Sequence, residues 1–180
     1  MVVAIFHKLA IPGLAAAAAA VAGAFGGSDQ DFAPAYNLPA SRVEALSLAQ
    51  SAAAQFDRAD LNNDFQLDSG EYAMLAVVTA ELARLNGFIP VISAGRAETV
   101  ALAEGQGAPL TGSDRAEIQH RALSDYAQIA GRDGRVTRDE FVGAQLELLF
   151  MIDADRDGAL SGAELAQFAA HASRLAPRQS

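Results

Sequence analysis

Apolar residues recur at helical spacing in several segments of the chain, and short polar stretches separate these segments. Between Val43 and Phe56, apolar residues fall three or four positions apart, which predicts an amphipathic helix. We expect this helix to begin at Ser41, because Glu44 lies three residues later and completes a capping box. Its predicted buried face consists of Val43, Leu46, Ala49, Ala53 and Phe56. Further helices are predicted to follow Asp68, Asp114, Thr137 and Ser161, the first of them ending at Asn86.

This pattern predicts an all-α protein of helix–loop–helix units behind an N-terminal apolar leader. We expect residues 1–24 to be a signal peptide or membrane anchor, residues 25–40 a linker, and residues 41–176 the helical domain. The domain contains an insertion at residues 87–112, which we interpret as a packed apolar loop with a short helix near residues 98–103. A long insertion in a small domain is often functional, so this one is the best candidate for a partner-binding element.

The polar stretch from Asp153 to Glu164 carries oxygen side chains at regular positions of a twelve-residue frame. Calcium binds six to eight oxygens at about 2.3–2.6 Å, and this spacing is typical of a calcium loop of the EF-hand type. Gly158 at position 6 permits the positive φ that the sharp turn demands. We predict that Ca²⁺ is bound by Asp153, Asp155, Asp157, the Ala159 carbonyl, Ser161 and Glu164.

A second frame of this kind runs from Asp60 to Glu71. Its predicted ligands are Asp60, Asn62, Asp64, the Gln66 carbonyl, Asp68 and Glu71. Position 6 is Phe65 rather than glycine, and a non-glycine residue at positive φ costs about 1–2 kcal/mol. We therefore expect weaker calcium binding here. The alternative is a former calcium loop that its own hydrogen bonds hold in shape.

A third frame, residues 129–140, is degenerate. Positions 1 and 3 are Ile129 and Gly131, which offer no carboxylate, and Arg135 adds positive charge. We interpret this frame as a structural loop without calcium.

The spacing of the frames limits which of them can pair. The frames that start at 129 and 153 are separated by a single helix of about 12 residues, roughly 18 Å long. Loops at opposite ends of one helix cannot lie side by side, so we predict that frame 60–71 pairs with frame 129–140. Loop 153–164 then needs another partner, such as a second molecule.

With two acidic loops and one degenerate frame, residues 41–175 resemble the bacterial EF-hand domain proteins, which are small exported chains with helix–loop–helix calcium motifs. The resemblance implies calcium as the ligand. It leaves the biological role open, because buffers, sensors, structural modules and enzyme appendages all carry this motif.

Composition and charge narrow the possible functions. The 180 residues are 51% apolar, which suffices for one domain with a core, and the formal net charge is −9. The acids gather in the loops, which favours cations as partners, and the lack of a basic patch argues against nucleic acid. With no cysteine, disulfides and thiolate metal sites are excluded. The histidines at 7, 120 and 171 have no partner at triad or metal spacing, so we expect no enzymatic activity.

The first residues of the chain favour export. Lys8 precedes an alanine-rich apolar run, and Ala22-Gly23-Ala24 fits the small-x-small rule for signal-peptide cleavage. We therefore expect a mature chain that starts near Phe25, in a periplasmic or secreted location. The run approaches the ~18 residues that can span a bilayer. Membrane anchoring by residues 9–26 is thus an alternative, and a buried helix of the domain is a further one.

Together these features predict an exported structural or interaction module stabilised by calcium, whose partner is an unidentified envelope protein. A calcium sensor that exposes an apolar surface and a membrane-anchored calcium buffer are the alternatives. Sensor grooves are often rich in methionine, whereas Met74 and Met151 are the only methionines of the domain. The sequence does not determine the oligomeric state.

Overall fold

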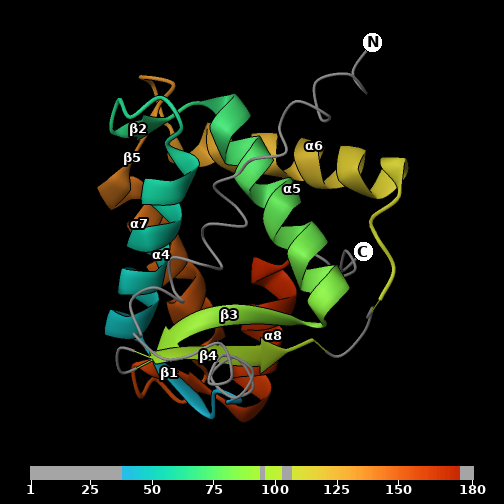
Figure 1. Cartoon of the computed structure of the whole chain (residues 1–180). Helices are drawn as coiled ribbons and strands as arrows, with labels where there is room; N and C mark the ends of the chain where they lie inside the picture. The colour runs from blue at the N-terminus through green and yellow to red at the C-terminus, as the bar shows by residue number, and fades with distance from the viewer. Residues whose placement is uncertain (1–37, 94–95, 103–106, 175–180) are drawn as a thin grey trace, which may run out of the picture. The chain divides into compact units, whose positions relative to one another are not determined.

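The described part of the chain, residues 38–93, 96–102 and 107–174 of a computed structural model, contains five helices joined by loops and short strands (Figure 1). The helices are α4 (Ala45–Ala59), α5 (Ser69–Asn86), α6 (Gly112–Ile129), α7 (Arg138–Ile152) and α8 (Gly162–Ala172). The strands are β1 (Arg42–Glu44), β2 (Gln66–Leu67), β3 (Phe88–Ser93), β4 (Arg96–Ala101), β5 (Val136–Thr137) and β6 (Ala159–Ser161). The predicted leader and most of the predicted linker lie outside the described residues.

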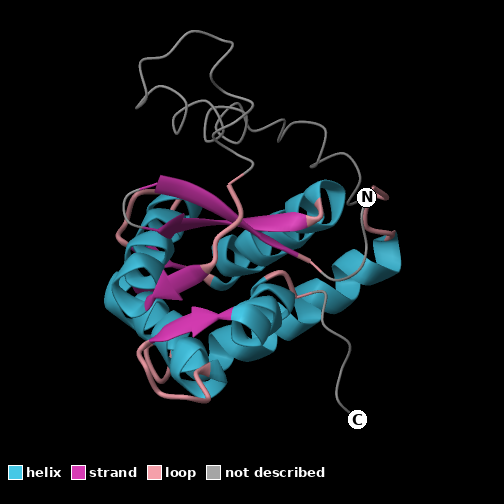
Figure 2. Cartoon of the chain, turned by 90° about the horizontal axis from the view of Figure 1, so that it is seen from below, coloured by secondary structure: helices cyan, strands magenta, loops and turns pink. Residues whose placement is uncertain are grey.

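The strands form three two-stranded antiparallel sheets, in which β1 pairs with β6, β2 with β5, and β3 with β4. Figure 2 shows these strands as short pieces set among the helices. The prediction of an all-α protein is therefore only partly correct, because the described residues form helices together with these small sheets. The β3–β4 hairpin is the main departure.

The hairpin occupies the insertion at residues 87–112, and the predicted short helix near residues 98–103 is wrong. Residues 98–101 belong to β4 and pair with β3, in a register that runs from Phe88 opposite Ala101 to Ser93 opposite Arg96. Ile89 and Val91 are buried while Pro90 between them is exposed, which is the alternation of a strand with one covered face. The β-branched residues of both strands favour this conformation over a helix.

Helix α4 begins at Ala45, four residues later than predicted, with Glu44 as its N-cap residue in extended conformation. Residues 42–44 form β1 instead, because Val43 pairs with Leu160 and is fully buried there. The later start changes the buried face, which consists of Ser47, Leu48, Ser51, Ala52, Phe56 and Ala59. Leu46 of the predicted face is 69% exposed.

The other helix ends follow local capping chemistry. Asp68 with Glu71, and Thr137 with Glu140, form the predicted capping boxes of α5 and α7. Helix α5 ends at Asn86, as predicted, and Gly87 follows it at φ 73°. Helix α6 begins earlier than its predicted cap at Asp114: Thr111 is the N-cap residue and Asp114 is its capping-box partner.

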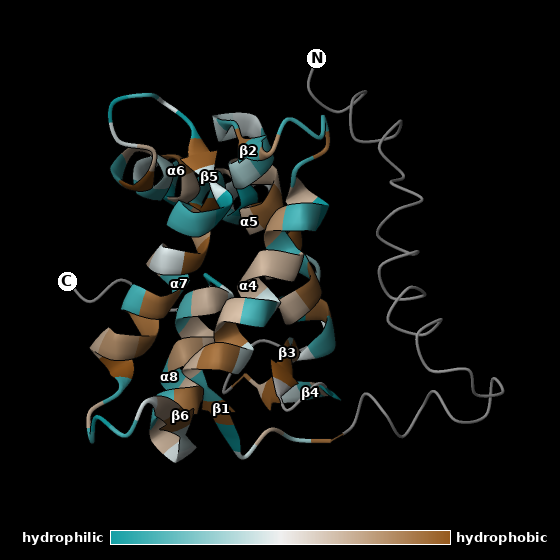
Figure 3. Cartoon of the chain, turned by 90° about the vertical axis from the view of Figure 1, so that its left-hand side faces the viewer, coloured by the Kyte–Doolittle hydropathy of each residue, from teal (hydrophilic) through white to brown (hydrophobic). Residues whose placement is uncertain are grey.

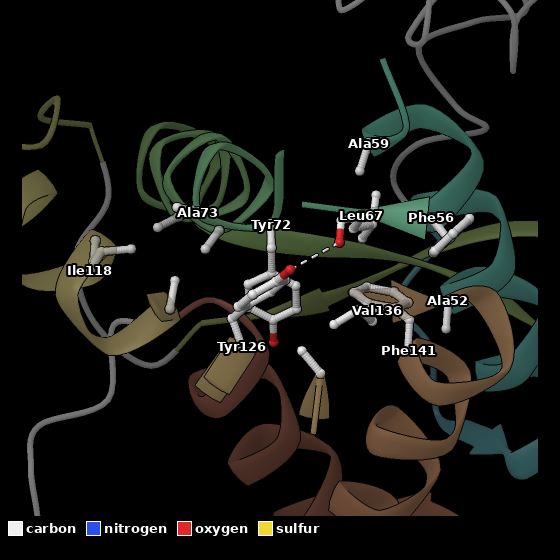
Figure 4. Packing of buried hydrophobic residues seen from close by; sticks show 14 of the residues in the cluster. Ala52, Phe56, Ala59, Leu67, Tyr72, Ala73, Ile118, Tyr126, Val136 and Phe141 are labelled. Atoms are coloured by element: carbon white, nitrogen blue, oxygen red, sulfur yellow. Dashed lines mark hydrogen bonds between the residues drawn. The ribbon is translucent and has the colours of Figure 1, made fainter. Parts of the chain in front are cut away.

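The buried residues form two clusters at opposite ends of α4 and α7. Figure 3 shows β2 and β5 at one end of these helices and β1 and β6 at the other. The first cluster lies beside β2 and β5, where the rings of Phe56 and Tyr72 each lie 6.1 Å from that of Phe141 (Figure 4). In the same cluster the Tyr126 hydroxyl donates to the carbonyl of Leu67, at 3.3 Å. The second cluster lies beside β1 and β6 and includes the inner face of the hairpin.

The predicted pairing of frame 60–71 with frame 129–140 is confirmed, because Gln66 pairs with Thr137 and Leu67 with Val136. The suggestion that loop 153–164 needs a second molecule is wrong. Its strand β6 pairs with β1 of the same chain, from a segment that the sequence assigned to a helix.

Candidate metal centre

The carboxylates of loop 153–164 face the backbone of the loop and are held by its N–H groups. Asp153 is 6% exposed, and its two carboxylate oxygens accept hydrogen bonds from the N–H groups of Asp157, at 3.2 Å, and Gly158, at 3.0 Å. The N–H of Asp157 also donates to the carboxylate of Asp155, at 3.2 Å. Asp157 in turn accepts from the N–H of Ala159, at 3.0 Å. These bonds turn the side chains of positions 1, 3 and 5 inward.

Glu164, in the first turn of α8, closes the loop. One of its carboxylate oxygens accepts from the N–H of Ala154 at 2.9 Å, and the other accepts from the N–H of Ser161 at 3.2 Å. As a result, carboxylate oxygens of Asp153, Asp155 and Glu164 lie within 4.8 Å of one another. The predicted carbonyl ligand, Ala159, lies in β6, and Ser161 ends this strand.

Loop 60–71 repeats this network position by position. The carboxylate of Asp60 accepts from the N–H groups of Asp64, at 3.1 Å, and Phe65, at 2.9 Å. The Asn62 side-chain oxygen accepts from the N–H of Asp64 at 2.8 Å. Asp64 accepts from the N–H of Gln66, in β2, at 3.0 Å. Positions 1, 3 and 5 therefore use the same backbone donors in both loops.

Position 12 is also equivalent in the two loops. The Glu71 carboxylate accepts from the N–H groups of Leu61 and Asp68, each at 3.0 Å. Asp68 at position 9 has a second task, because its side chain accepts from the N–H groups of Gly70 and Glu71 and caps α5. Within the described residues, three acids converge within the 4.8 Å limit at loop 153–164 but not at loop 60–71. Loop 60–71 thus has the scaffold of loop 153–164, with the uncharged amide of Asn62 in place of a carboxylate at position 3.

Both loops need left-handed backbone at positions 4 and 6. Asn63 and Arg156 have φ of 58° and 61°, and position 6 has φ of 64° in Phe65 and 78° in Gly158. The Phe65 side chain is 81% exposed, so it contributes little core packing that would offset the strain of this conformation.

The degenerate frame keeps part of the network. Asp133 accepts from the N–H of Arg135 at 3.1 Å, as position 5 does in the other loops, and Glu140 accepts from the N–H of Thr137 at 2.8 Å. Positions 1 and 3, Ile129 and Gly131, have no side-chain oxygen. The frame therefore retains the bonds that shape β5 and the start of α7, without a full set of oxygen donors.

An arginine contacts the position-5 carboxylate in both acidic loops. Arg42, in β1, lies 2.7 Å from Asp157, and Arg135, next to β5, lies 3.3 Å from Asp64. The hydrogen bond from Arg42 is the main reason that the pKa of Asp157 lies below its usual value. For Asp155, the N–H of Asp157 favours the ionised form, but desolvation and the nearby carboxylates outweigh it and raise the pKa.

The donor set of loop 153–164 fits calcium. All its candidate ligand atoms are oxygens, three of its acids already converge, and a hard cation prefers such a set over nitrogen or sulfur ligands. A cation there would also relieve the repulsion between the carboxylates, which together with desolvation raises the pKa of Asp155.

A family model described as EF hand matches residues 151–169, which include the end of α7, the whole loop and part of α8. Searches of curated proteins and of solved structures return no match. The family match and the convergent acids support an EF-hand domain and, in general terms, a calcium-binding protein.

Sequence reasoning missed Arg42 and the strand to which it belongs. A signal was present, because Arg42-Val43-Glu44 resembles Arg135-Val136-Thr137, and each triplet directly precedes a helix. The capping-box pattern at Ser41 favoured a helix start and concealed this similarity.

Proposed function

We propose that this protein is an exported structural or interaction module that binds calcium through loop 153–164 and is stabilised by it. The observation that carries the proposal is the convergence of Asp153, Asp155 and Glu164 in a loop that an EF-hand family model matches. Asp157, the Ala159 carbonyl and Ser161 complete the proposed ligand set.

The position of the loop supports a stabilising role. The proposed ligands lie in the loop that follows α7, in β6 and in the first turn of α8, and these helices and β6 pack in the second buried cluster. A divalent cation at their centre offsets part of the repulsion among four acids and links these elements. Because a ligand that binds only the folded state stabilises it, calcium at about 100 times its Kd contributes about 2.7 kcal/mol.

Loop 60–71 is proposed as a second and weaker site. It offers Asp60, Asn62, Asp64, the Gln66 carbonyl, Asp68 and Glu71, in the same hydrogen-bonded arrangement. The left-handed Phe65 at position 6 and the uncharged Asn62 at position 3 support the order of affinities.

A calcium sensor is the second candidate, and one observation favours it. Phe150 and Met151, at the end of α7 next to loop 153–164, are 60% and 76% exposed. An apolar surface beside a metal loop could bind a protein partner when calcium changes the position of α7. Calcium titration followed by NMR distinguishes the two, since a sensor shifts signals throughout α7 and α8 and a structural site mainly those of the loop.

Export remains a proposal based on residues 1–24, which lie outside the described residues. None of the described helices has the length and apolar character needed to cross a bilayer. An exported protein would meet external calcium, for which modules with a Kd of about 10⁻⁴–10⁻³ M are suited. Mass spectrometry of the natively expressed chain tests this, because an intact N-terminus would favour the anchor and contradict cleavage near Phe25.

The calcium assignment is tested by calorimetry and thermal unfolding of Glu164→Gln. This change removes a bidentate carboxylate but keeps its shape, so we expect loss of the tighter binding event and of the calcium-dependent rise in Tm. Glu147→Gln, on the exposed side of α7, is the matched control and should leave both unchanged. Unaltered calcium binding by Glu164→Gln would contradict the assignment.

A further inference from the structure

The two acidic loops have strand partners that occupy equivalent places. In one sheet, Leu67 at loop position 8 pairs with Val136, and in the other, Leu160 at the same position pairs with Val43. All four side chains are fully buried. Strand β1 therefore pairs with loop 153–164 in the same way that the degenerate frame 129–140 pairs with loop 60–71.

The equivalence extends to the arginines. Arg42 and Arg135 each precede the paired valine by one residue. Each donates to Oδ2 of a position-5 aspartate, whose Oδ1 accepts from a backbone N–H. The exposures of the two ion pairs are similar, 46% and 38% for Arg42 and Asp157, and 44% and 41% for Arg135 and Asp64. Two different segments of the chain thus place an arginine guanidinium against position 5 of the two loops.

We propose that β1 is a built-in substitute for a partner calcium loop, and that its Arg42 lowers the calcium affinity of loop 153–164 by holding the Asp157 carboxylate as a counter-charge. This inference rests on the proposed function. Without calcium, the guanidinium offsets part of the repulsion among four acids. When calcium binds, two cations share the Asp157 carboxylate and repel each other, so affinity is lower than these acids would otherwise provide.

The attachment of β1 supports a fixed position for Arg42. The preceding residues are bonded to the hairpin, where the N–H of Ala40 donates to the carbonyl of Thr99 at 2.9 Å and the N–H of Thr99 donates to the carbonyl of Leu38 at 3.1 Å. The N–H of Ala45 donates to the carbonyl of Gly158, at 3.2 Å, on the other side of β1. The strand is therefore held at both ends beside the loop.

The test measures calcium binding to the folded chain by calorimetry at low ionic strength. Arg42→Gln should raise the affinity of loop 153–164 about two- to fivefold, the scale of an exposed charge pair. The gain should shrink in about 1 M salt, where the screening length is roughly 3 Å. Arg42→Lys retains the charge and should stay near wild type.

Two further variants control for net charge and assign the site. Arg138→Gln removes an exposed ion pair with Asp57, at 2.9 Å, outside the proposed ligand sets, and should leave both affinities unchanged. Arg135→Gln in a Glu164→Gln background should raise the affinity of loop 60–71.

The outcomes separate the inference from the proposed function. A tighter wild-type binding event that Glu164→Gln abolishes, together with an unchanged or lower affinity of that event in Arg42→Gln, overturns the inference alone. Binding by Arg42→Gln but not by wild type supports the inference and contradicts the proposed function. If neither chain binds calcium, while circular dichroism shows both folded, both proposals are overturned.

Discussion

Loops 60–71 and 153–164 have one hydrogen-bond scaffold but differ in three residues that matter for a cation. Positions 1, 5 and 12 are the same types, and each loop has four acids. The fourth acid is Asp68 at position 9 in the first loop and Asp155 at position 3 in the second. Position 6 is Phe65 in one and Gly158 in the other.

The comparison shows that the conformation of the loop and the strength of its calcium ligands are separable. Backbone N–H groups hold the side chains of positions 1, 3, 5 and 12 in both loops, and this works with Asn62 as well as with Asp155. Asp68 caps α5, so its charge lies partly outside the ligand cluster. We infer that the scaffold survives substitutions that weaken the site, which is how the degenerate frame 129–140 can keep its fold.

The largest effect is expected from the buried leucines that anchor the loops. Leu67→Ala and Leu160→Ala each remove a fully buried side chain, and each should lower the free energy of unfolding by about 2–5 kcal/mol in urea titrations with chelator. Because the two residues belong to different clusters, each variant should weaken calcium binding mainly at its own loop.

Leu46→Ala is the control for these variants, since Leu46 is 69% exposed and should cost little stability. Equal loss of affinity at both loops in either variant would contradict the independence of the two clusters.

The position-6 exchange should have a smaller effect. Phe65→Gly should relieve about 1–2 kcal/mol of backbone strain and raise the affinity of loop 60–71, with no core contact to lose. Gly158→Ala should act in the opposite direction at loop 153–164, where an added Cβ meets no atom within 4 Å and only the backbone is strained. Calorimetry measures the calcium affinity of each loop separately when the other loop carries a glutamate-to-glutamine change at position 12, which is Glu164→Gln or Glu71→Gln.

Phe65→Gly could raise the free energy of unfolding without raising the calcium affinity of loop 60–71. That result would show that the backbone strain at Phe65 is equal with and without calcium. The expectation that Phe65 weakens the site would then be wrong.

The smallest effect is expected at position 3. Asn62→Asp adds a carboxylate to loop 60–71 and should raise its affinity, and Asp155→Asn should lower that of loop 153–164, each by a few-fold at low salt. In the presence of chelator, Tm should change in the direction opposite to affinity. It should fall in Asn62→Asp, where the new carboxylate repels the other acids of the loop, and rise in Asp155→Asn, where one such carboxylate is removed. If the Tm measured with chelator changed in the same direction as the calcium affinity, the electrostatic explanation would be contradicted.

The local chemistry of this protein could be predicted from its sequence. The loop frames, the capping boxes at Asp68 and Thr137 and the helix end at Asn86 depend on residues a few positions apart, so their spacing determines the structure. The reach of one helix was sufficient to predict that frame 60–71 pairs with frame 129–140, and to exclude pairing between frame 129–140 and loop 153–164. The candidate ligands follow from the same short-range spacing.

Only the tertiary structure decided the partner of loop 153–164 and the shape of the insertion. Residues 41–44 satisfy the pattern of a helix start. Residues 42–44 form β1 instead, because Leu160, distant in the sequence, offers Val43 a fully buried place in a strand pair. Within the insertion, β3 and β4 pair as a hairpin that packs in the same cluster and is hydrogen-bonded to the residues before β1. Burial and pairing across more than a hundred residues outweigh local preference here, and they bring Arg42 to Asp157, 115 residues away in the sequence.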